Sequence, residues 1–340
     1  MAIYKFLKRI GLDWFILAIA ACIFLAWLYP NIGIRREPLS LDDVATFGVS
    51  MVFFLYGLRL SPQKLREGLR NVRLHFVVQF MTFVTFPLIV LFLMRFVDFT
   101  PDSPDYYQWL GIFFLATLPS TVSSSVVMVA IAGGNVPAAI FNASISSLIG
   151  VFVTPLWMSM FVNASSGGYP ISDIVLKLIL QVLVPIVLGL LLNKKFGAWA
   201  EAHKAKLKYF DQCTILLIIY TSFCQSFYDK MFEGHSIAHL AELTAMVIAM
   251  FFLLYFIIFC VSRLMKFNRK DTITALFCGS KKSLVHGSVM SNVIFSNSAI
   301  AGVVLLPTML YHAAQLVIVS AIASAMAKKS EELERLASDS

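Results

Sequence analysis

Two adjacent lysines in an apolar stretch are the residues of this sequence with the clearest chemical potential. Lys281 and Lys282 lie near the middle of residues 273–295, a segment long enough to cross a bilayer. A cation at the bilayer centre costs about 2.5–3.5 kcal/mol on insertion scales, so such residues usually serve a function. Glycine and serine neighbours disfavour a regular helix, and broken backbone at membrane depth is tolerated only where protein or a cavity surrounds it. The stretch therefore predicts an ion or substrate site.

The lysines define the first group of candidate site residues. These candidates are Gly279, Ser280, Lys281, Lys282 and Ser283. The alternative for each lysine is a buried stem whose ammonium reaches the membrane surface, but both lie far from the ends of the span. We expect at least one of the two to be functional. Lys281 and His286 are also candidates for proton coupling, although a histidine among apolar residues is often simply hydrogen-bonded.

A second polar stretch lies in an earlier apolar segment, at residues 118–125. Five of the six residues after Pro119 are serine or threonine. Such hydroxyls can bond to the preceding helical turn and allow helices to pack closely, which is the alternative to a binding role. Because the stretch mirrors the lysine segment, we predict a site there and choose Pro119, Ser124 and Ser125 as its members.

Other polar residues within apolar segments are weaker candidates. Asn142 is included in the site, and the secondary candidates are Gln79, His312 and Gln315. As packing hydrogen bonds each would contribute only about 0.6–2 kcal/mol. His235 and His239 stand four residues apart without a third ligand, so no metal site is predicted. No nucleophile, base and orienting group recur at a recognisable spacing, so no catalytic residue and no enzyme is predicted.

The composition indicates the elements that position these residues. With 59% hydrophobic and 14% charged residues, the chain has too little polar surface for a water-soluble globule, so an all-α polytopic membrane protein is predicted. We expect the lipid bilayer to surround its apolar surface. The basic residues are spread over short loops, which argues against nucleic acid binding. Ten candidate spans begin near Trp14, Asp43, Leu74, Tyr107, Val136, Ile174, Leu207, Leu240, Thr272 and Ala299.

The distribution of basic residues predicts the orientation. Of 27 Lys and Arg residues, twenty fall in segments assigned to the inner side and five to the outer side, and two are Lys281 and Lys282. Positive residues favour the cytoplasmic side of a membrane. We therefore predict a multi-pass protein of the plasma membrane or bacterial inner membrane with both termini in the cytoplasm.

The two polar interruptions occupy corresponding places in two halves. Residues 1–165 form a first five-helix repeat, residues 166–327 a second and inverted one, and residues 328–340 a cytoplasmic tail. The fourth span of each half is interrupted, and the next span carries an internal proline, Pro155 or Pro307. Paired interruptions of this kind mark the central site of a transporter. Half-helix N-termini there can bind an anion, while free carbonyls and hydroxyls can coordinate a cation.

At these residues the sequence resembles the bile acid:sodium symporter family (solute carrier family 10), especially the branch of its seventh member. The resemblance covers nearly the whole chain. The segments that carry it are residues 11–15, 74–76, 118–124, 133–142, 219–224, 277–284 and 310–315. It implies ten spans in two inverted repeats, a panel and a core domain, and broken fourth and ninth helices that cross. It also implies an organic anion as the solute.

Sodium is the point at which the resemblance and the residues disagree. Sodium-coupled members bind two ions through the fourth, fifth and ninth helices, and Ser124 and Ser125 match ligands on the fourth. The ninth-helix Glu and Gln positions are Phe277 and Lys281 here. A cation 4 Å from sodium would repel it by about 4 kcal/mol at an effective dielectric of 20. A lysine could replace the ion or exchange protons, so Na⁺ or H⁺ is the candidate coupling ion, and no other cofactor is predicted.

The sequence therefore predicts a secondary transporter of an organic anion or similar small solute that works by alternating access, with doubtful sodium coupling. The alternative is a non-transporting regulator of membrane ion balance, for example of calcium, on the same scaffold, because a fold alone does not establish a function. Saturable solute flux in proteoliposomes separates the two.

Overall fold

The computed structural model describes residues 14–34, 40–59, 71–103, 105–121, 123–165, 176, 179–230, 236–295 and 298–338, and no β-strand occurs in these ranges. The α-helices are α2 (Trp14–Leu28), α3 (Pro30–Gly33), α4 (Leu41–Arg59), α6 (Val72–Phe80), α7 (Phe86–Leu93), α8 (Tyr106–Thr117), α9 (Ser123–Ile131), α10 (Val136–Ser165), α12 (Val184–Ala202), α13 (Lys204–Tyr228), α14 (Ile237–Leu264), α15 (Arg269–Gly279), α16 (Leu284–Ile294) and α17 (Ser298–Ser338). Shorter turns are the π-helices η1 (Met81–Thr85) and η3 (Ile179–Leu183) and the 3₁₀ turn η2 (Met94–Phe96). Each of the ten predicted spans overlaps at least one helix.

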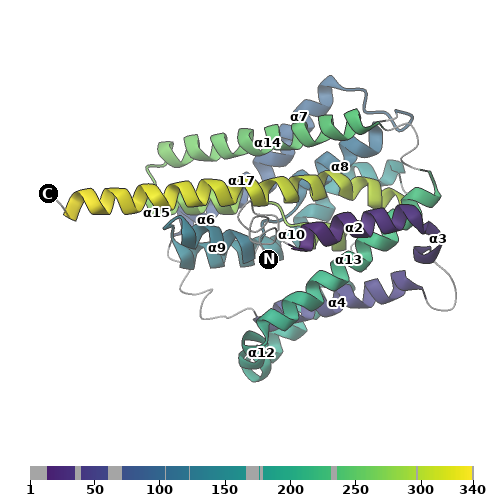
Figure 1. Ribbon diagram of the computed structural model, residues 1–340, viewed down its shortest axis with the longest axis horizontal. Coiled ribbons are helices and arrows are strands. Elements are labelled where there is room, and N and C mark those ends of the chain that lie inside the picture. Colours follow the sequence, from purple (N-terminus) through teal and green to yellow (C-terminus); the bar gives the residue numbers. More distant parts are fainter. Residues whose placement is uncertain are drawn as a thin grey trace, which may run out of the picture.

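Within the described residues, five helical segments are long and apolar enough to cross a membrane. They are Val72–Phe96, Val136–Phe161, Ile179–Ala202, Ala238–Leu264 and Ala299–Ala327. Figure 1 shows α14 and α17 running along the long axis of the molecule, with α4, α12 and α13 at its lower side. There α4 packs against α12 and α13, and α13 also packs against α2 and α17. This all-helical architecture is that of a polytopic membrane protein.

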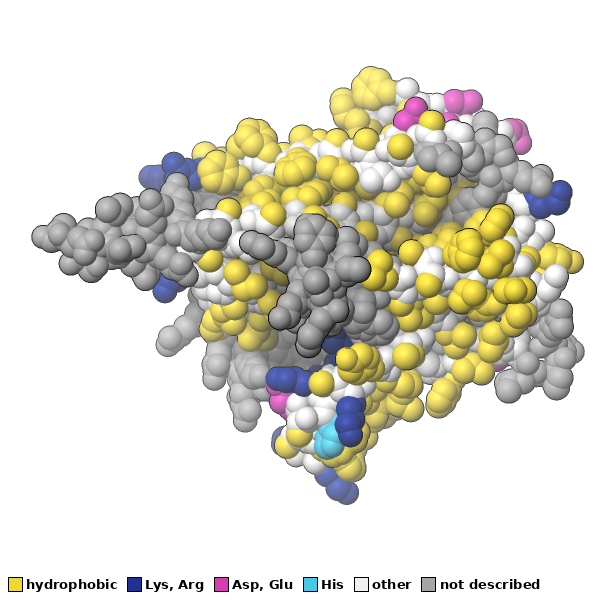
Figure 2. Space-filling model, viewed as in Figure 1, with side chains coloured by type: hydrophobic (Ala, Val, Ile, Leu, Met, Phe, Trp, Pro, Cys, Tyr) yellow, Lys and Arg dark blue, Asp and Glu magenta, His cyan; other side chains and the backbone are white. Residues whose placement is uncertain are grey.

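Side chains of different character separate on the surface. Figure 2 shows hydrophobic side chains over much of the visible face, as expected where helices meet lipid. Basic side chains lie at the left end, at the lower tip where α12 and α13 meet and at the right edge, whereas most of the visible acidic side chains lie at the upper right. Asp98, Asp102 and Asp105 belong to the segment between α7 and α8 at that end. The orientation itself, with both termini in the cytoplasm, stays a prediction.

A reciprocal pair of glycines brings α4 and α12 into close contact. A Cβ atom added to Gly57 would lie 2.2 Å from the carbonyl oxygen of Ile186, and one added to Gly189 would lie 2.1 Å from that of Phe54. Both obstacles are main-chain atoms, which cannot rotate aside as a side chain can. The side chain of Asn193 adds a 2.7 Å hydrogen bond from α12 to the carbonyl of Leu58. Small residues therefore allow these two backbones to touch.

Three helix starts are joined by one buried carboxylate. Asn268 caps α15, since its side chain accepts a hydrogen bond from the N–H of Asp271 at 2.8 Å. The Asp271 carboxylate accepts from the amides of Asn71 at 2.8 Å, Asn135 at 2.9 Å and Asn268 at 2.8 Å. Asn71 caps α6 and Asn135 directly precedes α10. This cluster fixes the start of α15, which leads to the second interruption, together with the starts of α6 and α10.

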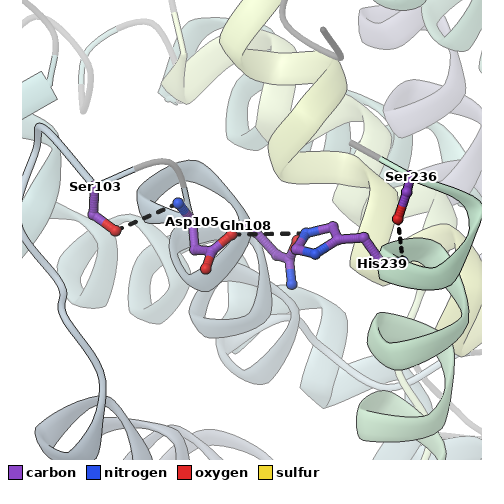
Figure 3. Close-up of polar contacts among 5 residues, drawn as sticks. All are labelled: Ser103, Asp105, Gln108, Ser236 and His239. Atoms are coloured by element: carbon purple, nitrogen blue, oxygen red, sulfur yellow. Dashed lines mark hydrogen bonds and ion pairs between the residues drawn. The ribbon is translucent and has the colours of Figure 1, made fainter. Parts of the chain in front are cut away.

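At the acidic end, α14 is fastened to α8 by a histidine (Figure 3). The ring nitrogen Nε2 of His239 forms a hydrogen bond with Oε1 of Gln108, and Oδ1 of Asp105 lies 3.7 Å from the same nitrogen. Ser236 caps α14 by accepting from the N–H of His239 at 3.2 Å. Ser103 in turn accepts from the N–H of Asp105 at 3.4 Å. His235 lies outside the described residues, within which no group of three or more His, Cys, Asp or Glu side chains is placed to hold a metal.

Candidate functional site

The two interruptions predicted from the sequence meet in the fold. Residues 118–122 separate α8 from α9, and residues 280–283 separate α15 from α16. The main-chain N–H of Ser283 donates to the carbonyl oxygen of Pro119 at 2.9 Å. Because one break comes from each half of the chain, this hydrogen bond joins the halves through their backbones. It marks the centre of the candidate site.

The ammonium group of Lys282 is enclosed by main-chain oxygens. Its Nζ atom donates to the carbonyls of Thr82 at 2.8 Å, Ala116 at 2.6 Å and Leu118 at 2.8 Å. The same atom lies 4.9 Å from the ring centroid of Phe86, within the range of a cation–π contact. The residue is fully buried. Since an ammonium has three N–H donors, each of them has an acceptor here.

These three carbonyls lack main-chain donors for identifiable reasons. Those of Ala116 and Leu118 lie at the C-terminal end of α8, where carbonyls have no partner within the helix. The negative end of the α8 dipole points the same way, which favours a cation at this position. Thr82 belongs to η1, one turn before Pro87, and proline has no N–H to donate back to that turn. The lysine thus completes the hydrogen bonding of two irregular helix segments.

A glutamine on α17 holds the main chain of the same lysine. The N–H of Lys282 donates to Oε1 of Gln315 at 2.9 Å, and Nε2 of Gln315 donates to the Lys282 carbonyl at 2.7 Å. The Nδ1 atom of His312 lies 2.9 Å from the same Nε2 atom. Tyr311 donates to the carbonyl of Ser280 at 2.6 Å. The secondary candidates His312 and Gln315 therefore lie at the second break and contribute to its shape.

The ammonium group of Lys281 has different surroundings. It donates to the hydroxyl of Ser124 at 2.8 Å. That hydroxyl donates to Thr121 at 2.9 Å, and the Thr121 and Ser125 hydroxyls are 2.8 Å apart. Lys281 is fully buried, and Ser124 is its one hydrogen-bond acceptor among the described residues. Two N–H donors of this buried ammonium therefore have no acceptor among the described residues.

The His286 ring contacts Ser283 and two aromatic rings of α4. Its Nδ1 atom lies 2.9 Å from the hydroxyl of Ser283, which also caps α16. The ring meets Phe53 and Tyr56 of α4 edge-on, with centroid distances of 5.6 and 6.2 Å. Its Nε2 atom is buried without a hydrogen-bond partner in the described part of the chain. The proton-coupling role of His286 stays a prediction.

The remaining predicted residues form hydrogen bonds between helices. Nε2 of Gln79 donates to the main-chain oxygen of Asn142 at 3.1 Å and to its side-chain oxygen at 3.2 Å, which joins α6 to α10. The carbonyl of Gly279 lies 3.5 Å from the hydroxyl of Thr82. Their roles as ligands stay predictions, since these contacts are also those of helix packing.

Sequence reasoning missed the partners of Lys282. Three of these partners contribute main-chain oxygens and the fourth an apolar ring, so their side-chain types do not indicate cation binding. The oxygens belong to Thr82, Ala116 and Leu118, and the ring belongs to Phe86. The one usable signal was Pro87, which removes a donor from an otherwise regular span.

A sequence model of the SBF-like CPA transporter family matches residues 13–328, a range that includes both interruptions and both lysines. The chain belongs to this family. An uncharacterized protein of Pseudomonas aeruginosa is 38% identical to this SBF-like transporter over 320 residues, which cover 94% of each chain. Sodium/bile acid cotransporter 7-B of Xenopus laevis is 32% identical over 321 residues, 93% of this chain and 92% of its own. Sodium/bile acid cotransporter 7 of Danio rerio is 32% identical over 323 residues, 93% of this chain and 94% of its own.

These similarities confirm the predicted family resemblance. They also confirm that this SBF-like protein belongs among transporters and not among enzymes. Together with the apolar helices, they identify an integral multi-pass membrane protein.

The hydroxyls of Thr121, Ser124 and Ser125 form a cluster that could offer oxygen ligands to a sodium ion. Hydroxyl oxygens suit a small hard cation, but the Lys281 ammonium lies 2.8 Å from one of them. A sodium ion on the same oxygens would lie within about 4 Å of that positive charge, at a cost of about 4 kcal/mol in a medium of effective dielectric 20. These residues therefore do not fit sodium while Lys281 is charged and in this position.

Proposed function

We propose that this SBF-like transporter is a secondary active transporter that moves an organic anion or a similar small solute by alternating access. The crossing of the two breaks is its solute site. The observation that carries the proposal is Lys281, a buried ammonium with one hydroxyl acceptor in the described residues. A buried charge is stabilised by a counter-charge, and a carboxylate or sulfonate solute supplies one.

The helix ends at the crossing support the same solute class. The positive N-terminal ends of α9 and α16 begin at the two breaks, beside the Lys281 side chain. Half-helix N-termini recognise anionic groups of substrates in transporters with paired broken helices. The names of the two vertebrate relatives refer to sodium and bile acid as what those proteins transport. For this chain we propose an anion without assigning a steroid.

Alternating access follows from the paired breaks. We propose that residues 1–165 and 166–327 are inverted repeats whose fourth and ninth spans cross at the site, as the hydrogen bond between Ser283 and Pro119 supports. Both termini then lie in the cytoplasm, which the separation of basic and acidic ends in Figure 2 supports.

The coupling ion is proposed to be a proton or none, and not sodium. Lys281 occupies the hydroxyl cluster that sodium needs, and Lys281 or His286 is the candidate for proton exchange. A solute anion that pairs with the ammonium would change its tendency to hold a proton, which is how transport and proton movement become linked.

The test is solute flux with the purified full-length protein in proteoliposomes. Radiolabelled taurocholate and a set of small carboxylates and sulfonates are offered under a sodium gradient, a choline gradient and a pH gradient. We expect saturable uptake of at least one anion that is unchanged when choline replaces sodium. Liposomes without protein and Ser124→Ala protein are the controls, and Ser124→Ala is expected to weaken uptake.

Two results would contradict the proposal in different ways. Uptake that requires sodium would overturn the sodium independence alone. Absence of uptake and of counterflow for every anion, with folded protein in the membrane, would instead favour the non-transporting regulator.

A further inference from the structure

The surroundings of Lys282 differ from those expected of a structural lysine. A buried lysine commonly pairs with a carboxylate. Within the described residues no carboxylate forms an ion pair with Lys282, and its three acceptors are all main-chain carbonyls. The ammonium also lies over the face of the Phe86 ring, 4.9 Å from its centroid. Carbonyl oxygens and a ring face are the groups that receive a bare monovalent cation when protein replaces its water.

The carbonyls also meet the other requirements of such a site. They come from the end of α8 and from the π-turn before Pro87, so they are held by helices and not by a mobile loop. Neither irregularity can be repaired locally, because one is a helix end and the other follows from a proline. Gln315 fixes both main-chain polar groups of Lys282, so the lysine stem starts from a defined position. The oxygens are therefore arranged for a cation independently of the lysine stem.

We propose that the Lys282 ammonium is a tethered monovalent cation, which fills a carbonyl site that binds a small free cation when the side chain is shortened. The charge at the crossing is then permanent and needs no ion from solution. Lys281, with two N–H donors open, remains for the solute. This inference rests on the sodium independence proposed above. Its readout is thermal stability and not transport, so the carbonyl site can be refuted while transport is confirmed, and transport can be refuted while the carbonyl site is confirmed.

The test is chemical rescue of a shortened side chain in the purified full-length protein. Lys282→Ala lacks three carbons and the ammonium, and n-propylammonium has that composition. Melting temperatures are measured in detergent in n-propylammonium chloride and in choline chloride at equal ionic strength. 1-Propanol, with the same number of heavy atoms and no charge, controls for filling of apolar space. Lys281→Ala is the matched variant, since it removes the neighbouring lysine, which has a single acceptor in the described residues.

We expect Lys282→Ala to melt below wild type in choline and to gain about 2 °C or more from n-propylammonium, with no equal gain from 1-propanol. Wild type and Lys281→Ala are expected to gain less than half as much. If Lys282→Ala can be purified only with the amine, that recovery is the same positive result. Lys282→Met keeps the stem and removes the charge, and we expect it to melt several degrees below wild type.

Either of two results overturns the proposal. One is a Lys282→Met protein as stable as wild type, because the carbonyls then need no cation. The other is a response of Lys282→Ala to n-propylammonium no larger than that of Lys281→Ala or than its own response to 1-propanol.

Discussion

Lys281 and Lys282 are neighbours in the chain, yet their ammonium groups bind different kinds of acceptor. That of Lys281 lies 2.8 Å from the Ser124 hydroxyl, while that of Lys282 lies 2.6–2.8 Å from three main-chain carbonyls. Within the described residues, the Lys282 ammonium has an acceptor for each of its three N–H donors, whereas the Lys281 ammonium has one acceptor. The two positive charges of the crossing therefore have different roles, and variants of each should behave differently.

Replacing Lys281 by glutamine should create a response to sodium. The variant removes the charge from the Thr121, Ser124 and Ser125 hydroxyls and leaves an amide oxygen as a further ligand. With sodium at tenfold excess over its dissociation constant, binding would stabilise the variant by about 1.4 kcal/mol, or a few degrees in melting temperature. Thermal melts in sodium and in choline measure it.

The control for this prediction is the double variant Lys281→Gln with Ser124→Ala. Since it lacks the hydroxyl that Lys281 contacts, it should lose most of the sodium response. A sodium-specific rise in the melting temperature of wild type would contradict the expectation.

Gln315→Met should destabilise the protein by about 2–4 kcal/mol. The change leaves both the N–H and the carbonyl of Lys282 buried without a partner, and each such group costs about 1–3 kcal/mol. Gln212→Met is the control, because Gln212 is also buried but its Oε1 atom has no hydrogen-bond partner in the described ranges. The measurement is the melting temperature of each variant. Equal decreases for the two variants would contradict the role of Gln315 in holding the main chain of Lys282.

Asp271→Asn should loosen the starts of α6, α10 and α15 together. An asparagine side chain has one acceptor oxygen and turns an NH₂ group toward the amide donors of Asn71, Asn135 and Asn268. Loss of even one hydrogen bond to a charged group costs about 1.5–3 kcal/mol. Hydrogen exchange should rise at all three helix starts. Asp229→Asn is the control, since that carboxylate is exposed and accepts one hydrogen bond from Gln225, and its effect should stay within about 0.5 kcal/mol.

Gly189→Ala should cost far more than Gly197→Ala, although both glycines lie on α12. The added methyl at Gly189 meets main-chain atoms of α4, and overpacking of this kind costs about 1–3 kcal/mol. At Gly197 the methyl meets the Asn193 side chain, whose displacement would cost at most its one hydrogen bond to Leu58, about 0.5–1.5 kcal/mol, and alanine adds about 1 kcal/mol of helix propensity. Melting temperatures of the two variants give the comparison. A similar loss for both would mean that the α4–α12 contact adjusts more easily than its geometry indicates.

The sequence supports the helical segments and the two breaks because their signals are local. Apolar length defines the spans, and the clustered glycine, proline and serine residues at 118–125 and 277–283 mark the interruptions. Ser283 also caps α16 in the usual way. These features depend on residues close together in the chain, so a single sequence contains them.

The site itself depends on contacts that no local pattern records. Nothing in the sequence distinguishes Lys281 from Lys282, since the difference lies in which distant groups each ammonium reaches. The acceptors of Lys282 are main-chain oxygens, which every residue carries. Gln315 was only a secondary candidate because a glutamine in a span is compatible with many packing roles, and its two hydrogen bonds to Lys282 appear only when α17 packs beside the break.

The Lys282 contacts also set an order on the biosynthesis of the protein. The carbonyls of Thr82, Ala116 and Leu118 precede their common donor by 200, 166 and 164 residues. A chain made from its N-terminus therefore places three acceptors within the membrane long before the lysine emerges from the ribosome. Until then, water, lipid headgroups or the insertion machinery must bind those oxygens, because unsatisfied carbonyls are costly in hydrocarbon. A chain that ends before residue 282 therefore lacks the donor for three carbonyls of its first half.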